Sequence, residues 1–357
     1  MTPISDNYNL AGRLLTVTLL LLVLPGLLMA QVEKEKRISK SYKVTGNTEV
    51  SFSNSFGMMQ IETWNRNEVE VEVLIKVKMR NERDAQKALD KIDVNIDDSN
   101  PASSLSFSTD IRNMKNINGE SFSVDYMIKM PSDLKLEAIN KFGETVLDSY
   151  DGDLKLRNEY GHLRADKLNG NSEVEVKFGN GEIDYMKSGQ LKVSYSEFSA
   201  DRIDDVKADL SFSEVEIDEV GAMDLKIKYG ELKIDQLTSL KGKGSFTSIE
   251  IERLSDRLVL EGSYISDLEI GMVEGGFSLI DIKNSFGETK IGFDEDSGAV
   301  IEADFSFGEL KYDKQLGINF SNMEEKNNNS SYRGSFGNGK GKIRLSGNYA
   351  NGRLILD

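Results

Sequence analysis

An aromatic residue recurs every 17 or 18 residues through the middle of this 357-residue sequence, and no other feature limits the fold as strongly. The recurring residues are Phe142, Tyr160, Phe178, Tyr195, Phe212, Tyr229, Phe246 and Tyr264. Between them apolar and polar residues alternate with a period of two, which is typical of β-strands. A short fixed period predicts an array in which each unit buries its apolar side against its neighbours.

We therefore predict an all-β fold, a single-stranded β-solenoid (β-helix) with coils of 17–18 residues and one short N-terminal helix. The alternation breaks twice in each unit, which indicates corners and a roughly triangular cross-section. Each coil adds about 4.8 Å of rise, the spacing of hydrogen-bonded strands. We expect the coil to be right-handed.

The aromatic residues are in phase with the inward positions of this alternation, so we predict that their rings stack inside the core. An outward platform on which sugar rings stack is the less favoured alternative. The residue after the ring is Gly at most coils, but Thr247 and Ile265 take the same place. Because β-branched residues avoid a left-handed backbone, this corner is expected to need a small residue for reasons of crowding.

A row of acidic residues marks the second corner, one in each coil. Its members are Asp148, Asp166, Asp184, Asp201, Asp218 and Asp235. The favoured explanation is that each carboxylate accepts a hydrogen bond from a backbone N–H at the turn. The alternative is a row of divalent-cation sites, since hard cations bind clustered carboxylate oxygens. We assign no catalytic, cofactor-binding or metal-binding residue.

Asparagine occurs at a few inward positions, two residues before an aromatic residue. These residues are Asn54, Asn140, Asn158 and Asn284. A buried carboxamide needs hydrogen-bond partners, and in a stack these lie on the coils above and below. We therefore predict a structural role for them.

The first 30 residues have the pattern of a signal peptide: Arg13, an apolar run at 14–28, and a cleavage site after Ala30. An uncleaved anchor is the alternative, because the apolar run is near the lower limit for a membrane span. In both cases we expect export to the periplasm or the cell surface of a bacterium.

The remaining chain divides into four parts. Residues 31–135 are predicted as a β-rich region with a short helix at 82–92 and Asn81 as its N-cap. Residues 136–320 carry the solenoid repeats. Residues 321–341 are rich in Asn, Gly and Ser and predict a flexible loop, and 342–357 predict C-terminal capping strands.

The stretch "NSFGMMQIETWNRNEVEVEVLIKV", the Ala-containing helix, the strand ending in "MP" and the repeated Phe-Gly units together resemble the bacterial exported "putative adhesin" domain of unknown function. The resemblance covers most of the exported chain. It implies an exported β-solenoid of the cell envelope, and it supplies no catalytic residues.

Composition excludes several function classes. The net charge of −16 and the pI near 4.8 argue against nucleic acid as a partner. There is no cysteine, and His162 is the single histidine. We expect a non-catalytic envelope protein that binds a protein or glycan partner, with no cofactor and no membrane span after signal cleavage. The alternatives are a polysaccharide-active β-helix enzyme and a self-assembling envelope scaffold.

Overall fold

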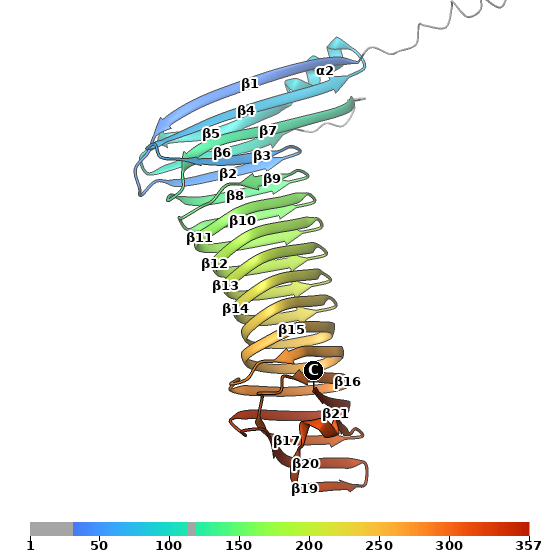
Figure 1. Cartoon of the computed structure of the whole chain (residues 1–357). Helices are drawn as coiled ribbons and strands as arrows, with labels where there is room; N and C mark the ends of the chain where they lie inside the picture. Colours follow the sequence, from blue (N-terminus) through green and yellow to red (C-terminus); the bar gives the residue numbers. More distant parts are fainter. Residues whose placement is uncertain (1–30, 113–118, 357) are drawn as a thin grey trace, which may run out of the picture.

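The computed structural model describes residues 31–112 and 119–356, and it shows an all-β protein (Figure 1). In these residues, 21 strands join into one sheet. The all-β class predicted from the sequence is confirmed. The predicted signal peptide at 1–30 lies outside the described residues.

The middle of the sheet is a stack of parallel strands in which the chain returns to the same place every 17 or 18 residues (Figure 1). Leu154 pairs with Ser172, and Glu197 pairs with Glu214. We call each such repeat a rung. The strands of the stack are β8 (Lys135–Lys141), β9 (Thr145–Leu147), β10 (Leu154–Glu159), β11 (His162–Lys177), β12 (Asn180–Ser194), β13 (Glu197–Ser211), β14 (Glu214–Lys228), β15 (Glu231–Val273) and β16 (Leu279–Phe293). Strand β15 is 43 residues long and spans more than one rung.

Alternation along each strand separates the core from the surface. In β14, Val215 and Ile217 are buried while Glu214 and Glu216 are exposed. Because side chains on a strand point to opposite sides in turn, every rung contributes the same inward columns. The result is one apolar core that runs along the whole stack.

The four inward asparagines, Asn54, Asn140, Asn158 and Asn284, are buried as predicted. Asn54 Nδ2 donates to Val124 O at 2.8 Å, and Asn284 Nδ2 donates to Ile265 O at 2.9 Å. These bonds join neighbouring rungs as predicted, whereas Asn140 Oδ1 and Asn158 Nδ2 are buried without a hydrogen-bond partner among the described residues.

At the N-terminal end, a group of seven strands adds antiparallel pairings to the parallel ones of the stack. These are β1 (Val32–Lys43), β2 (Glu49–Ser55), β3 (Met59–Trp64), β4 (Glu68–Met79), β5 (Ile92–Asn100), β6 (Ser104–Ile111) and β7 (Gly119–Pro131). Strands β2 and β3 form the first rung, in parallel with β8 and β9. Strand β4 then pairs antiparallel with β7, and β1 pairs antiparallel with β4. The edge strand β1 is rich in Lys, Arg and Glu, which discourages pairing with another chain.

The α-helix α2 (Glu82–Leu89) is shorter than the predicted span of 82–92. Its backbone ends at Asp90, whose N–H bonds Gln86 O, and the chain enters β5 at Ile92. The predicted N-cap is confirmed, since the Asn81 side chain accepts a hydrogen bond from Asp84 N at 2.9 Å. The helix buries Ala85, Ala88 and Leu89.

Residues 321–341 do not form the predicted flexible loop. Most of them belong to an antiparallel hairpin of β19 (Asn319–Lys326) and β20 (Asn329–Phe336). Only Asn327 and Asn328 make the turn, with left-handed φ values of 52° and 62°. The polar composition misled the prediction because β19 is an exposed edge strand, which needs few apolar residues.

The C-terminal segment predicted to cap the stack lies inside it instead. Residues 342–356 belong to the single strand β21 (Gly341–Leu356), which pairs in parallel with β16 on one side. On its other side it pairs with β17 (Ala299–Ser306) and β18 (Leu310–Tyr312). The 3-10 helix η1 (Lys314–Leu316) follows β18. The hairpin β19–β20 covers this end, through the antiparallel pairing of β20 with β17 (Figure 1).

Within residues 31–112 and 119–356, no helix has the length and apolar character that crossing a membrane requires.

Candidate functional site

The recurring aromatic side chains lie on the outside of the stack, so the prediction that they fill the core is wrong. Each keeps between 38% and 53% of its surface exposed. In spatial order they are Phe56, Phe142, Tyr160, Phe178, Tyr195, Phe212, Tyr229, Phe246, Tyr264, Phe286, Tyr349 and Phe307. We call these twelve side chains the aromatic ridge.

The outward direction of the ridge follows from its backbone. Every ridge residue has a left-handed φ, between 52° and 64°. Asn140 points inward, and an extended chain would point Phe142 inward too. The left-handed turn at Phe142 reverses that direction. Such a conformation costs a residue with a side chain about 1–2 kcal/mol, so the contacts of the ring must offset it.

The residue after the ring is held small by crowding, as predicted. A Cβ placed on Gly161 would lie 1.9 Å from Gly143 O, on the rung before it. A Cβ on Gly143 would lie equally close, at 1.9 Å, to Gly57 O. The left-handed residue at this corner is therefore the ring-bearing one, and the glycine allows close approach of consecutive rungs.

Neighbouring rings in the ridge are stacked face to face with an offset. Their centroids are 4.5–5.2 Å apart and their planes differ by 3–12°. Each ring face is thus covered by the next ring, and the edges point to solvent. A sugar stacks on a ring face, so the interior of the ridge does not offer the platform considered from the sequence.

Tyrosine and phenylalanine alternate along the ridge from Phe142 onward. The alternation continues at the C-terminal end only because Tyr349 of β21 stacks between Phe286 and Phe307. Tyrosine hydroxyls therefore occur on every second rung. At this spacing the ridge presents an apolar edge with regularly placed hydrogen-bonding groups.

The face that follows the ridge is strongly acidic. On the seven rungs from Phe142 to Phe246 we take the outward positions two, four and six residues after each ring and call them the acidic face. It holds fourteen carboxylates: Glu144, Asp148, Asp166, Glu182, Asp184, Glu197, Asp201, Glu214, Glu216, Asp218, Glu231, Asp235, Glu250 and Glu252. Its two basic side chains are Arg164 and Lys233.

The face that precedes the ridge has the opposite balance. On the same rungs we take the outward positions one, three and five residues before each ring and call them the basic face. Its ten basic side chains are Lys141, Lys155, Arg157, Lys177, Lys192, Lys207, Lys226, Lys228, Lys241 and Lys243. Its six acidic ones are Glu137, Glu159, Glu173, Glu175, Asp209 and Asp224. The ridge therefore separates surfaces of opposite sign.

The acidic row singled out in the sequence lies within the acidic face. At Asp148 the turn explanation has support, because Thr63 N donates to Asp148 Oδ2 at 3.2 Å. Burial, followed by the neighbouring Asp235 and Asp201, raises the pKa of Asp218 above its ordinary value. Among the described residues no three carboxylate or histidine side chains are grouped to hold a metal ion.

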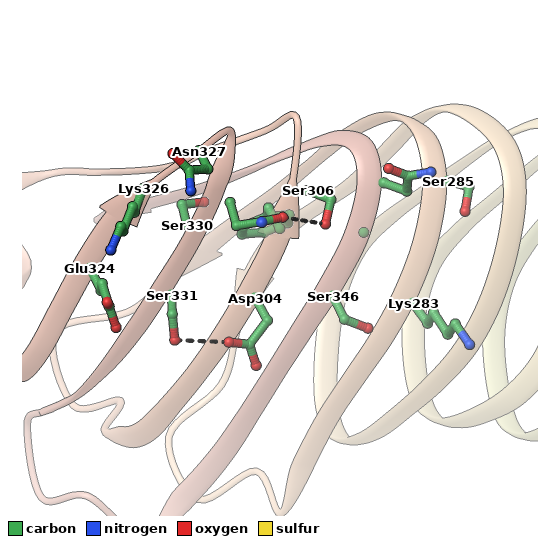
Figure 2. A pocket seen from close by; sticks show the side chains of 14 residues that line it. Lys283, Ser285, Asp304, Ser306, Glu324, Lys326, Asn327, Ser330, Ser331 and Ser346 are labelled. Atoms are coloured by element: carbon green, nitrogen blue, oxygen red, sulfur yellow. Dashed lines mark hydrogen bonds between the residues drawn. The ribbon is translucent and has the colours of Figure 1, made fainter.

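A polar groove of about 700 Å³ is lined by the side chains drawn in Figure 2, and the strands that carry them lie at the end of the stack opposite to β1 (Figure 1). We call it the tip groove. Its lining comes from β16, β17, β19, β20 and β21 and consists mostly of hydroxyl and carboxamide groups. Among these groups are Ser285, Ser306, Ser346, Asn327, Asn329 and Asn348.

The charges of the tip groove balance each other. Lys283 and Lys326 stand against Asp304 and Glu324. Hydrogen bonds from Arg333, at 2.8 and 3.0 Å, hold the pKa of Asp304 below its ordinary value, and Ser331 Oγ donates to it at 2.9 Å (Figure 2). In a chain with a net charge of −16, this region is locally neutral.

Several polar groups of the groove have unused hydrogen-bonding capacity. Ser306 Oγ donates to Asn329 Oδ1 at 2.7 Å, which leaves the Asn329 amide N–H groups available. The side chains of Ser285, Ser346 and Asn348 have no hydrogen bond to another described residue. This site was not predicted from the sequence, because 321–341 was expected to be a flexible loop. The cluster of Asn and Ser in that segment was the available signal.

His162 stands at the start of β11, opposite Asn180 of the next rung, on the outward side. Its side chain has no hydrogen bond to another described residue. No ion pair joins it to a carboxylate of the described residues either.

The fold defines the class of the protein: an all-β chain whose strands join into one long stacked sheet. No family model matches the chain, and no curated protein matches it. Solved structures that resemble it include a "putative cell adhesion protein" from Clostridium sporogenes, with 11% identity, 91% of this chain and 100% of that chain covered, and a TM-score of 0.20.

Two structures from Parabacteroides distasonis are also similar. A "putative adhesin" has 16% identity, covers 72% of this chain and 97% of its own, and has a TM-score of 0.34. A "putative lipid binding protein" has 12% identity, covers 89% of this chain and 96% of its own, and has a TM-score of 0.31. With every one of these TM-scores below 0.5, the function has to be argued from the residues of this chain.

Proposed function

We propose that this chain is a non-catalytic binding protein of the bacterial cell envelope that holds a glycan in its tip groove. The observation that carries the proposal is the lining of that groove, which is neutral and rich in hydroxyl and carboxamide groups. A glycan offers hydroxyl groups that both donate and accept hydrogen bonds. Side chains such as Ser346 and Asn348 match that chemistry, because they too donate and accept.

The location of the groove also supports a binding role. The signal-like segment 1–30 supports export to the periplasm or the cell surface. The strands that line the groove lie at the far end of the stack from β1 (Figure 1), away from the N-terminal region. The return of the chain every 17–18 residues supports a β-solenoid as the spacer between the two ends, and we retain a right-handed coil as the prediction.

Enzymatic activity on polysaccharides is the less favoured alternative. Such chemistry needs two carboxylates converging on the scissile bond, or a cation beside a base. In the tip groove, Asp304 is held by Arg333 and Ser331, which stabilises its charged form and makes it a poor acid. Turnover of pectin, alginate or a related polysaccharide by the purified protein would favour the enzyme.

The scaffold alternative requires stacks that join end to end. Antiparallel strands close both ends of the described sheet, and the N-terminal edge strand is highly charged. Both features discourage continued strand pairing. We expect electron microscopy of the purified protein to show separate particles without filaments.

The binding proposal is tested with an array of bacterial and eukaryotic glycans and purified residues 31–357. We expect one group of related glycans to bind. The double variant Ser346→Ala/Asn348→Ala should weaken binding about tenfold or more, since each lost hydrogen bond contributes about 0.5–1.5 kcal/mol. The control Ser245→Ala removes a hydroxyl from the column that contains Asn348, away from the groove, and should bind normally. Equal binding by all three proteins, or no glycan bound, would contradict the proposal.

A further inference from the structure

The aromatic ridge exposes more apolar surface than a solitary soluble protein normally does. An aromatic side chain offers about 150–250 Å², and about half of it is exposed here, which gives roughly 1,000 Å² over the ridge. The largest apolar patch on a typical monomer is about 300–600 Å². Two such ridges in contact would bury up to about 2,000 Å², which is enough for a stable dimer of about 1,600 Å².

The repeat along the ridge selects the partner. Ring follows ring at 4.5–5.2 Å, and this spacing is set by the rise of hydrogen-bonded strands. Few surfaces carry the same repeat over ten or more units. A second copy of this chain does, so that each ring edge of one copy can meet a ring edge of the other along the whole ridge.

The charges on either side of the ridge select the orientation. If a two-fold axis runs parallel to the two stacks, the acidic face of each copy adjoins the basic face of the other. If the stacks run in opposite directions, acidic face adjoins acidic face and basic adjoins basic. The acidic face carries fourteen carboxylates and only two basic side chains. The second arrangement places two such faces side by side, which is repulsive.

The positions next to the ridge agree with the parallel arrangement rung by rung. In the parallel arrangement, the residue directly before each ring of one copy lies opposite the residue two positions after the matching ring of the second copy. The meeting residues are Lys141 with Glu144, Glu159 with His162, Lys177 with Asn180, Ser194 with Glu197, Ser211 with Glu214, and Lys228 with Glu231. No pair carries like charges. Tyrosine also meets tyrosine on every second rung, so their hydroxyls can pair with each other.

We propose that two copies of this chain pack side by side along their aromatic ridges, with parallel axes and the acidic face of each against the basic face of the other. The dimer does not require glycan binding, although Ser285, Ser306 and Asn348 of the tip groove each precede a ridge ring and so lie beside the contact between the two copies. A parallel dimer places both tip grooves at the same end, and an antiparallel one would separate them by the length of the stack.

The association is tested by sedimentation velocity of purified residues 31–357 at micromolar concentration. We expect a dimer whose dissociation constant rises with salt. Lys228→Glu should weaken it roughly five- to tenfold, because it faces Glu231 of the second copy with a like charge. The swap Lys228→Glu/Glu231→Lys should restore association. Lys226→Glu makes the same charge change two residues further from the ridge and serves as the control.

Circular dichroism of each variant separates unfolding from loss of the dimer. A folded protein that remains monomeric would overturn the proposal, including the case in which the ridge binds another envelope component instead. A dimer that is unaffected by Lys228→Glu would overturn it as well.

The orientation is tested with spin labels, which the absence of native cysteine allows. Single variants Ser55→Cys and Ser263→Cys place a label beside the ridge near opposite ends of the stack. In the parallel dimer both variants give short label-to-label distances. In an antiparallel dimer centred on the ridge, eleven rungs of 4.8 Å would separate the two Ser55 labels, about 53 Å, and five rungs would separate the two Ser263 labels, about 24 Å. Long distances at both sites would refute the parallel arrangement.

Discussion

At Phe212 we expect the glycine variant to be more stable than the alanine variant, which reverses the usual order for a β-strand. Phe212 is 47% exposed, and the rings of Tyr195 and Tyr229 lie 4.7 and 4.8 Å from its own, centroid to centroid. Covering about half of a 150–250 Å² side chain contributes roughly 2–3 kcal/mol, and two ring contacts add about 1–3 kcal/mol. Both replacements lose these contributions.

The two replacements differ in their backbone. Phe212 has a φ of 53°, a left-handed conformation that costs alanine about 1–2 kcal/mol and costs glycine almost nothing. We therefore expect a loss of about 3–6 kcal/mol for Phe212→Ala and about 2–4 kcal/mol for Phe212→Gly.

Urea unfolding followed by circular dichroism measures both losses. Leu210 is the matched control, since it is buried in β13, two residues before the ring, and its backbone is extended. There Leu210→Ala should be more stable than Leu210→Gly, by about 0.5–1 kcal/mol. If Phe212→Ala is as stable as Phe212→Gly in urea, the left-handed backbone does not explain the outward direction of the ridge.

Three further predictions follow from the corners and the acidic face. Gly161→Ala should destabilise the protein by about 3 kcal/mol or more in thermal unfolding, because the new Cβ would lie 1.9 Å from Gly143 O. The control Gly46→Ala should leave the stability unchanged, because its Cβ would have no atom within 4 Å. Asp218→Asn should raise the melting temperature at pH 7, because a raised pKa means that the fold disfavours the charged form; the gain should fade as the pH is lowered through the folded pKa and the wild-type carboxyl takes up its proton. A calcium titration should leave the melting temperature unchanged, and a concentration-dependent rise would revive the cation row.

The periodic part of the fold could be predicted from the sequence because its cause is local. Alternation in segments such as that from Glu214 to Ile217 reports directly which side chains enter the core, and the interval between aromatic residues reports the length of a rung. The inward asparagines followed from the same alternation. These features need no knowledge of distant contacts.

The aromatic ridge was placed on the wrong side because alternation assumes an extended backbone. At Phe142 the left-handed backbone of a single residue reverses the direction of the side chain. An aromatic residue rarely adopts this conformation, so the sequence gives no sign of it. The tip groove was missed for a different reason. It is assembled from five strands whose pairing depends on contacts far apart in the chain, including the pairing of β21 with β16.

The order of the last strands has a consequence for how the molecule is built. Strand β21 is made after β17 and β20, yet it lies between β16 and β17. As the chain is made from the N-terminus, rungs can be added one after another as far as β16. The next strand of the stack is β21, which is made last. Until β21 arrives, β17 has the open edge of β16 as a competing partner, because Ile280 and Ile301 both pair with Ile343.

Premature closure would place Phe307 directly on Phe286 and leave Tyr349 without its place in the ridge. Because β21 supplies Ser346 and Asn348, the tip groove is complete only once this last strand has taken its place between β16 and β17.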